Sequence, residues 1–136
     1  IDFSLLKFLF LKYINMREVL KNRVIGEKDA VMFDIDDTLI FTSGVANVEM
    51  IQLLYYARNL GYKIVIITAR PTNELTARIT KIQLHKYKIP YDFLYITPAE
   101  NKGNVKVQTG LNYILSVGDQ ETDLTNTLHA IKIHIN

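Results

Sequence analysis

The sequence contains no cysteine, no tryptophan and no apolar run long enough to cross a bilayer. The lack of cysteine excludes disulfides, thiolate metal sites and cysteine nucleophiles, and it is typical of a reducing compartment, so we expect a cytoplasmic protein. The most apolar stretch, residues 3–14, is interrupted by Lys7 and Lys12 and has no small-residue cleavage site after it, so it predicts neither a membrane span nor a signal peptide. A net charge of +2 without a run of Lys or Arg indicates no nucleic-acid-binding patch.

Length and composition are those of one ordered domain. The chain has 136 residues, of which 49% are hydrophobic, enough for a single packed core. We predict one domain over residues 1–136, with an N-terminal helix within 1–24 and the main α/β unit in 30–136. The apolar stripe of that helix is unusually wide, so packing on the sheet competes with two alternatives, a dimer face and a membrane-surface helix.

The strongest local signal lies in residues 31–39, VMFDIDDTL, where an apolar run leads directly into acidic residues. The apolar half predicts a buried strand. Asp34, Asp36 and Asp37 repel one another, and burying any of them requires a partner. Hard oxygen ligands of this kind suit Mg²⁺. The alternative is that Asp36 and Asp37 cap the next segment or lie solvated in a turn.

Helix and strand patterns alternate along the rest of the chain. We predict helices at about 2–23, 47–60, 73–87 and 121–130, and strands at 31–35, 63–68, 91–96, 114–117 and 131–135. This alternation predicts a doubly wound, mainly parallel Rossmann-like sheet of about five strands with flanking helices.

Polar residues follow several of these strands. Asp34 and Asp36 follow the first, Thr68 ends the second, and Gly118-Asp119 end the fourth. Ligands of an open parallel sheet bind beyond the carboxyl ends of its strands, so we expect these residues to converge. Carboxylates around magnesium, together with a lysine and a hydroxyl, suit a phosphoryl group, whose phosphorus an Asp can attack.

Four groups of polar residues occur in a characteristic order: Asp34-x-Asp36-x-Thr38, Thr68, a lysine, and Gly118-Asp119-x-x-x-Asp123. This order, over about residues 31–123, resembles the four motifs of the haloacid dehalogenase (HAD) superfamily of phosphohydrolases. The stretch 33–39 with Thr68-Ala69-Arg70 is similar to the class B acid phosphatase branch. The resemblance implies a magnesium-dependent phosphatase that hydrolyses phosphomonoesters through an aspartyl-phosphate.

The resemblance also implies roles for individual acidic residues. Asp34 would be the nucleophile and a magnesium ligand. Asp36 would be the general acid and base, with its backbone carbonyl also on the metal, and an Asp at this place favours phosphatase chemistry. Asp119 would bind magnesium directly. Asp123 would support the metal site without coordinating it, or pair with the lysine.

The phosphate-binding groups implied by the same resemblance are the Thr68 side chain, the Ala69 N–H and one lysine. Ala69 replaces the Gly of the family's Thr-Gly-Arg pattern but keeps the N–H. Two lysines qualify, and we favour Lys106 over Lys102 because it lies thirteen residues before Asp119 at the expected start of a helix.

The spacing between motifs leaves no room for a cap domain, because only residues 40–62 separate the first motif from the second strand. We therefore expect a capless enzyme whose phosphorylated substrate is large or nucleotide-like, or whose site is covered by a second subunit in a homo-oligomer. Two alternatives from other classes remain. One is a phosphoacceptor signalling domain, disfavoured because no Asp ends the third strand. The other is a catalytically idle relative that binds phosphorylated ligands or partners.

Overall fold

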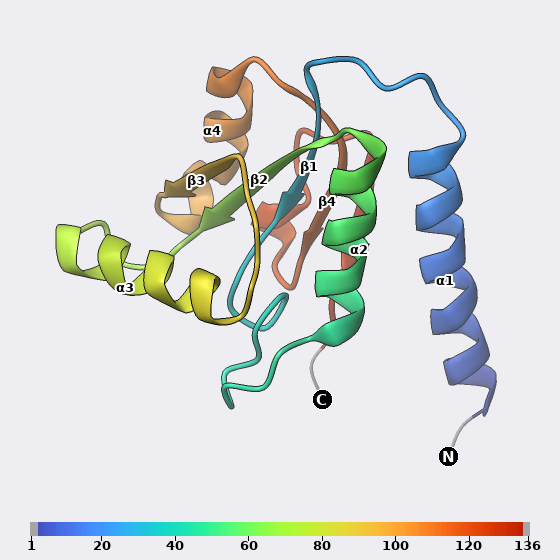
Figure 1. Ribbon diagram of the computed structural model, residues 1–136, viewed down its shortest axis with the longest axis horizontal. Coiled ribbons are helices and arrows are strands. Elements are labelled where there is room, and N and C mark those ends of the chain that lie inside the picture. The colour runs from blue at the N-terminus through green and yellow to red at the C-terminus, as the bar shows by residue number, and fades with distance from the viewer. Residues whose placement is uncertain (1–2, 135–136) are drawn as a thin grey trace.

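A parallel five-stranded sheet in the order β3-β2-β1-β4-β5 forms the centre of the computed structural model, which describes residues 3–134 (Figure 1). The strands are β1 Asp29–Phe33, β2 Lys63–Thr68, β3 Phe93–Ile96, β4 Asn112–Gly118 and β5 His129–Lys132. The helices are α1 Phe3–Lys21, α2 Val48–Leu60, α3 Glu74–Lys86 and α4 Lys102–Thr109, with two 3₁₀ turns, η1 Ala99–Asn101 and η2 Glu121–Asp123. The predicted α/β class with an additional N-terminal helix is confirmed.

The central strand β1 is buried on both faces, which explains its continuous apolar sequence. It pairs in parallel with β2 on one side and β4 on the other, and all five of its residues are buried. Helices α1 and α2 lie on one side of the sheet and α4 on the other (Figure 1). Val31 and Phe33 face the first helical layer, whereas Ala30 and Met32 face the second, as expected from the two-residue period of a strand.

The segment after β4 differs from the expected helix at 121–130. Only the single turn η2 is helical, and β5 begins at His129 rather than at residue 131; residue 135 of the expected strand lies outside the described residues. Asn126 adopts a left-handed conformation with φ +53°, which cannot occur inside an α-helix. The predicted helix at 121–130 is therefore wrong. The backbone carbonyls of Asp123 and Thr125 accept hydrogen bonds from the Lys106 ammonium, in place of the N–H groups of a continuing helix.

The connection from β1 to β2 consists of a loop and α2, in agreement with the expected lack of an inserted cap domain. A tight turn follows β1, in which the Ile35 carbonyl accepts hydrogen bonds from the N–H groups of Thr38, Leu39 and Ile40. Among residues 3–134, no helix has the length and apolar character needed to cross a membrane.

Candidate functional site

Side chains from four segments meet beyond the carboxyl ends of β1, β2 and β4, as the topology requires. They line a cavity of about 370 Å³. Its walls include Asp34 and Asp36 after β1, Ala69 and Arg70 after β2, Lys102 at the start of α4, and Asp119 after β4. The structure therefore brings most of the predicted site residues to one place.

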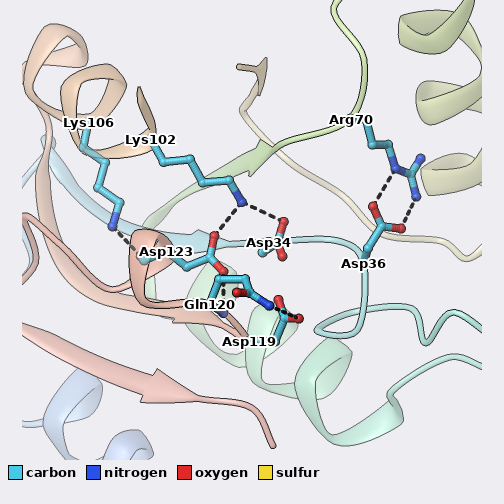
Figure 2. Close-up of polar contacts among 8 residues, drawn as sticks. All are labelled: Asp34, Asp36, Arg70, Lys102, Lys106, Asp119, Gln120 and Asp123. Carbon is cyan, nitrogen blue, oxygen red and sulfur yellow. Dashed lines mark hydrogen bonds and ion pairs between the residues drawn. The ribbon is translucent and has the colours of Figure 1, made fainter. Parts of the chain in front are cut away.

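A buried ion-pair cluster occupies the centre of this site. The Lys102 ammonium donates to Asp34 Oδ1 at 3.0 Å and to Asp123 Oδ1 at 2.5 Å. The side chains of all three residues are at most 8% exposed. Figure 2 shows Lys102 reaching between the two carboxylates from α4. One cation thus faces two buried anions.

This imbalance changes the acid–base behaviour of the cluster. Burial raises the pKa of Asp34 to about 7, and the neighbouring Lys102 ammonium offsets only part of that effect. Burial also lowers the pKa of Lys102, but Asp34 and Asp123 outweigh it and leave that pKa above its ordinary value. Lys102 is therefore charged, while Asp34 needs a further positive charge to be fully ionised at neutral pH.

A third carboxylate completes an acidic group suited to a divalent cation. One carboxylate oxygen from each of Asp34, Asp119 and Asp123 lies within 4.8 Å of the others. Once all three carboxylates are ionised, they leave a net charge of −2 against the one ammonium, and hard carboxylate oxygens are the donors that Mg²⁺ prefers. The donor set therefore fits the magnesium ion expected from the sequence.

Gly118 is needed for the close approach of Asp123. A Cβ atom at Gly118 would lie 2.3 Å from the Cβ and Oδ2 atoms of Asp123, which is too close for any side chain. The Gln120 N–H donates to Asp123 Oδ2 at 3.1 Å, so the turn after β4 also orients this carboxylate. In the Gly118-Asp119 pair, the glycine is thus required so that the Asp123 side chain can pack against the backbone, and the aspartate contributes a carboxylate to the acidic group.

Asp36 lies apart from the buried cluster and is held by Arg70. The guanidinium donates from Nη2 to Asp36 Oδ1 at 2.8 Å and from Nε to Asp36 Oδ2 at 3.0 Å, a bidentate geometry (Figure 2). Arg70 also donates to Thr80 Oγ1 at 3.1 Å, which ties the pair to α3. The Asp36 carboxylate is therefore fixed in orientation while remaining accessible to a substrate.

The two candidate lysines differ sharply in position. Lys106 does not reach Asp34: its ammonium donates to Ser116 Oγ, the Asp123 carbonyl and the Thr125 carbonyl at 2.6–2.9 Å. Burial lowers its pKa to about 8. Lys106 lies in the last turn of α4 rather than at its expected start, and its contacts are to the η2 segment and Ser116. Lys102, the first residue of α4, is the lysine that contacts Asp34.

Thr68 and Ala69, the residues at the end of β2 that we expect to bind phosphate, lie at the edge of the site. Thr68 is fully buried, and its hydroxyl has no hydrogen-bond partner among residues 3–134. An unpaired buried hydroxyl is unfavourable and marks a position where a ligand atom or water is expected. Ala69, the next residue, lines the cavity itself.

Three further residues at the site were not assigned a role from the sequence. Arg70 was noted only as part of a motif, yet it is the partner of Asp36. Gln120 donates through Nε2 to Asp119 Oδ2 at 3.3 Å. Thr122 lines the cavity, and its buried hydroxyl has no hydrogen-bond partner within the described part of the chain. Arg70 was marked by the Thr68-Ala69-Arg70 motif, whereas the only sequence signal of Gln120 and Thr122 was proximity to Asp119.

Comparison with known proteins identifies the class. The family model of haloacid dehalogenase-like hydrolases matches residues 31–116. That match covers more than half of the chain and contains Asp34, Asp36, Thr68 and Lys102, so the chain belongs to this family of hydrolases. No curated protein matches the sequence.

Two solved structures have a similar fold. One, described as "Structure of Pnkp1/Rnl/Hen1 complex", matches with a TM-score of 0.60 at 19% identity, covering 81% of this chain and 47% of the other. The second, described as "Structure of the Pnkp1/Rnl/Hen1 RNA repair complex", has a TM-score of 0.57 at 18% identity, covering 82% and 44%. At these identities the likeness shows the fold alone, and this chain spans less than half the length of the chains it matches.

Proposed function

We propose that this hydrolase is a magnesium-dependent phosphomonoesterase that acts through an aspartyl-phosphate on Asp34. The observation that carries the proposal is the buried cluster of Asp34, Lys102 and Asp123, with Asp119 beside it, at the carboxyl edge of the sheet. A nucleophilic carboxylate, a fixed ammonium and an acidic metal site are the groups that phosphoryl transfer requires.

In the first step, an Asp34 carboxylate oxygen forms a bond to phosphorus as the bond from phosphorus to the leaving oxygen breaks. Asp36 donates a proton to that oxygen, which requires one of its two carboxyl oxygens to leave Arg70, because Arg70 holds both in the structure. Lys102 offsets charge on the phosphoryl oxygens, and the Thr68 hydroxyl and Ala69 N–H donate to them. In the second step, Asp36 takes a proton from water, the water oxygen bonds to phosphorus, and Asp34 is released as a carboxylate.

Mg²⁺ would be held by Asp34 and Asp119, with the Asp36 carbonyl as a further ligand. When bound, it would neutralise negative charge on the phosphoryl group. Both carboxylate oxygens of Asp123 accept hydrogen bonds, Oδ1 from Lys102 and Oδ2 from the Gln120 N–H, so we assign Asp123 to holding the lysine rather than to direct coordination. The same positive charge favours the ionised form of Asp34, against the effect of burial.

Magnesium binding is expected to stabilise the protein measurably without any substrate. Saturating Mg²⁺ should raise the Tm by about 9 °C, because a ligand at 100 times its Kd contributes about 2.7 kcal/mol. Asp119→Asn should abolish most of the shift. Glu121→Gln is the matched control, because Glu121 is exposed and bonded to Lys132 outside the cluster. Differential scanning fluorimetry with and without EDTA measures the effect, and an unchanged shift in Asp119→Asn would exclude this metal site.

Asp36→Asn is expected to affect substrates according to their leaving group. An alkyl phosphate needs its leaving oxygen protonated, so kcat/KM should fall about 10²–10⁴-fold. A p-nitrophenolate leaves without a proton, so its kcat/KM should fall at least about tenfold less. The ratio of the two losses, measured by phosphate release, isolates the acid role. Equal losses for both substrates would argue that Asp36 serves only to hold substrate or metal.

The substrate class we propose is a large phosphorylated molecule, including nucleotides and nucleic-acid ends. Only a loop and α2 join β1 to β2, so no inserted domain covers the cavity. One similar structure is described as an RNA repair complex. The test panel therefore includes RNA with terminal phosphates. Phosphopeptides, sugar phosphates and nucleotides complete that panel.

A further inference from the structure

The outward face of α1 is unusually apolar in its N-terminal half. Leu9, Tyr13, Met16 and Leu20 follow one helical stripe toward the domain, and Leu20 is fully buried. On the remaining sides, large apolar side chains are between 39% and 76% exposed: Phe3, Leu6, Phe8, Phe10, Leu11 and Ile14. Packing on the domain therefore satisfies only part of the apolar surface of this helix.

The C-terminal half of α1 is firmly attached to the domain. The Tyr62 hydroxyl donates to the Leu20 carbonyl at 2.7 Å, and the Arg17 guanidinium lies 5.1 Å from the centre of the Tyr56 ring. Figure 1 shows α1 lying alongside α2, at the outside of the helical layer. The apolar half is thus presented on a helix whose orientation is fixed, as an interaction surface requires.

The exposed apolar area suits a protein interface. An aromatic side chain can bury on the order of 200 Å², so these six side chains, each roughly half exposed and spread over the remaining sides of α1, present at most about 600 Å². That is the upper end of the range of roughly 300–600 Å² for the largest apolar patch on a monomer, and such patches are often functional. A standard interface buries on the order of 800 Å² per partner, so the part of this surface around Leu11 and Ile14 can form the apolar centre of an interface.

One exposed face of α1 carries charges that are complementary to those of the same face on a second, antiparallel copy. Lys7, Leu11, Ile14 and Glu18 lie on one face at spacings of i, i+4, i+7 and i+11, away from the stripe that packs on the domain. Ile14 is at the edge of this face, because it also lines a cavity between α1 and α2. All four are exposed, with a positive charge at one end, a negative charge at the other and apolar residues between. Two such helices laid antiparallel bring Lys7 to Glu18 of the second copy twice, and Leu11 to Ile14 of the second copy twice.

We propose that this face of α1 binds the same face of a second copy, forming an antiparallel two-fold helix pair. Such an interface is isologous, so one patch serves both subunits. The proposal does not depend on the phosphatase assignment, because Lys7, Leu11, Ile14 and Glu18 are not among the residues that line the site cavity.

Sedimentation velocity over a concentration series tests the pair. The wild type should be dimeric, and Leu11→Asp should raise the dimer Kd at least tenfold. Ile82→Asp on α3 is the matched control, since Ile82 is 68% exposed and should leave the Kd unchanged. A wild type that stays monomeric throughout would overturn the proposal. Recruitment of that monomer to anionic phosphatidylserine vesicles would assign the face to a membrane surface instead.

Charge reversal tests the antiparallel register. Glu18→Lys should weaken the dimer about tenfold by placing like charges together twice, and the double variant Lys7→Glu with Glu18→Lys should restore it. The absence of native cysteine allows a second test. Under mild oxidation, a mixture of Leu11→Cys and Ile14→Cys chains should cross-link more than either chain alone. Stronger cross-linking of Leu11→Cys alone, or no rescue by the double reversal, would overturn the antiparallel pair.

Discussion

Replacing Asp34 with Asn is expected to reduce kcat for phosphomonoester hydrolysis by about 10⁴ or more, the scale of loss seen when a nucleophile is removed. Asn matches Asp in shape and can still accept a hydrogen bond from Lys102, but an amide oxygen does not form a phosphoryl adduct. Burial already opposes ionisation of Asp34 and raises its pKa to about 7. The neutral Asn should therefore fold normally, so that the loss is chemical.

Asp37→Asn is the matched control for that experiment. Asp37 belongs to the same acidic stretch, but its carboxylate accepts hydrogen bonds from the N–H and hydroxyl of Thr42. Its φ of +60° is tolerated by Asn as well as by Asp. This variant should retain activity within a few-fold. Turnover by Asp34→Asn at a rate close to that of the wild type would remove Asp34 as the nucleophile.

Replacing Lys102 with Met is expected to lower kcat/KM by about 10³, because a preorganised cation at the reacting phosphoryl group contributes roughly 3–4 kcal/mol. The variant also leaves Asp34 and Asp123 without their shared ammonium. Urea unfolding in EDTA should therefore show lower stability, and added Mg²⁺ should recover part of it. Phosphate release at a magnesium concentration that keeps the variant folded measures the catalytic effect separately.

Lys106→Met distinguishes the two lysines. Its ammonium holds two backbone carbonyls and Ser116 Oγ rather than Asp34, so its loss should reduce the free energy of unfolding by about 2–4 kcal/mol. Activity per folded molecule should fall much less than in Lys102→Met. Lys81→Met on the exposed face of α3 is the control for stability. Catalytic loss confined to Lys106→Met would return the phosphate-binding role to Lys106.

The difference between these lysines illustrates what the sequence could and could not predict. Strand positions followed from apolar runs, and the convergence of Asp34, Asp36 and Asp119 followed from the rule for parallel sheets. Which lysine lies beside Asp34 depends on the residue at which α4 begins, and this was not predicted correctly. Lys102 is its first residue and lies at the carboxyl edge of the sheet, whereas Lys106 lies four residues further, about 6 Å along the axis. A boundary error of one helical turn is enough to exchange which of the two is expected beside Asp34.

The segment after β4 shows a second limit. Residues 121–130 carried a helical pattern, but Lys106 binds the carbonyls of Asp123 and Thr125 and thereby removes two acceptors from a continuing helix. Contacts between residues about twenty positions apart cannot be seen in a local pattern. The bidentate pairing of Arg70 with Asp36, 34 residues away, escaped prediction for the same reason.

Release of inorganic phosphate with and without magnesium tests the central claim most directly. The folded wild-type protein should release phosphate from p-nitrophenyl phosphate, or from at least one of the nucleotides, sugar phosphates, phosphopeptides and RNA ends of the panel, only when Mg²⁺ is present. Excess EDTA should stop the reaction, and fresh Mg²⁺ should restore it. Undiminished release in excess EDTA would contradict the metal assignment. If protein that shows the magnesium-dependent Tm shift releases phosphate from no member of the panel, the proposed phosphatase function is contradicted.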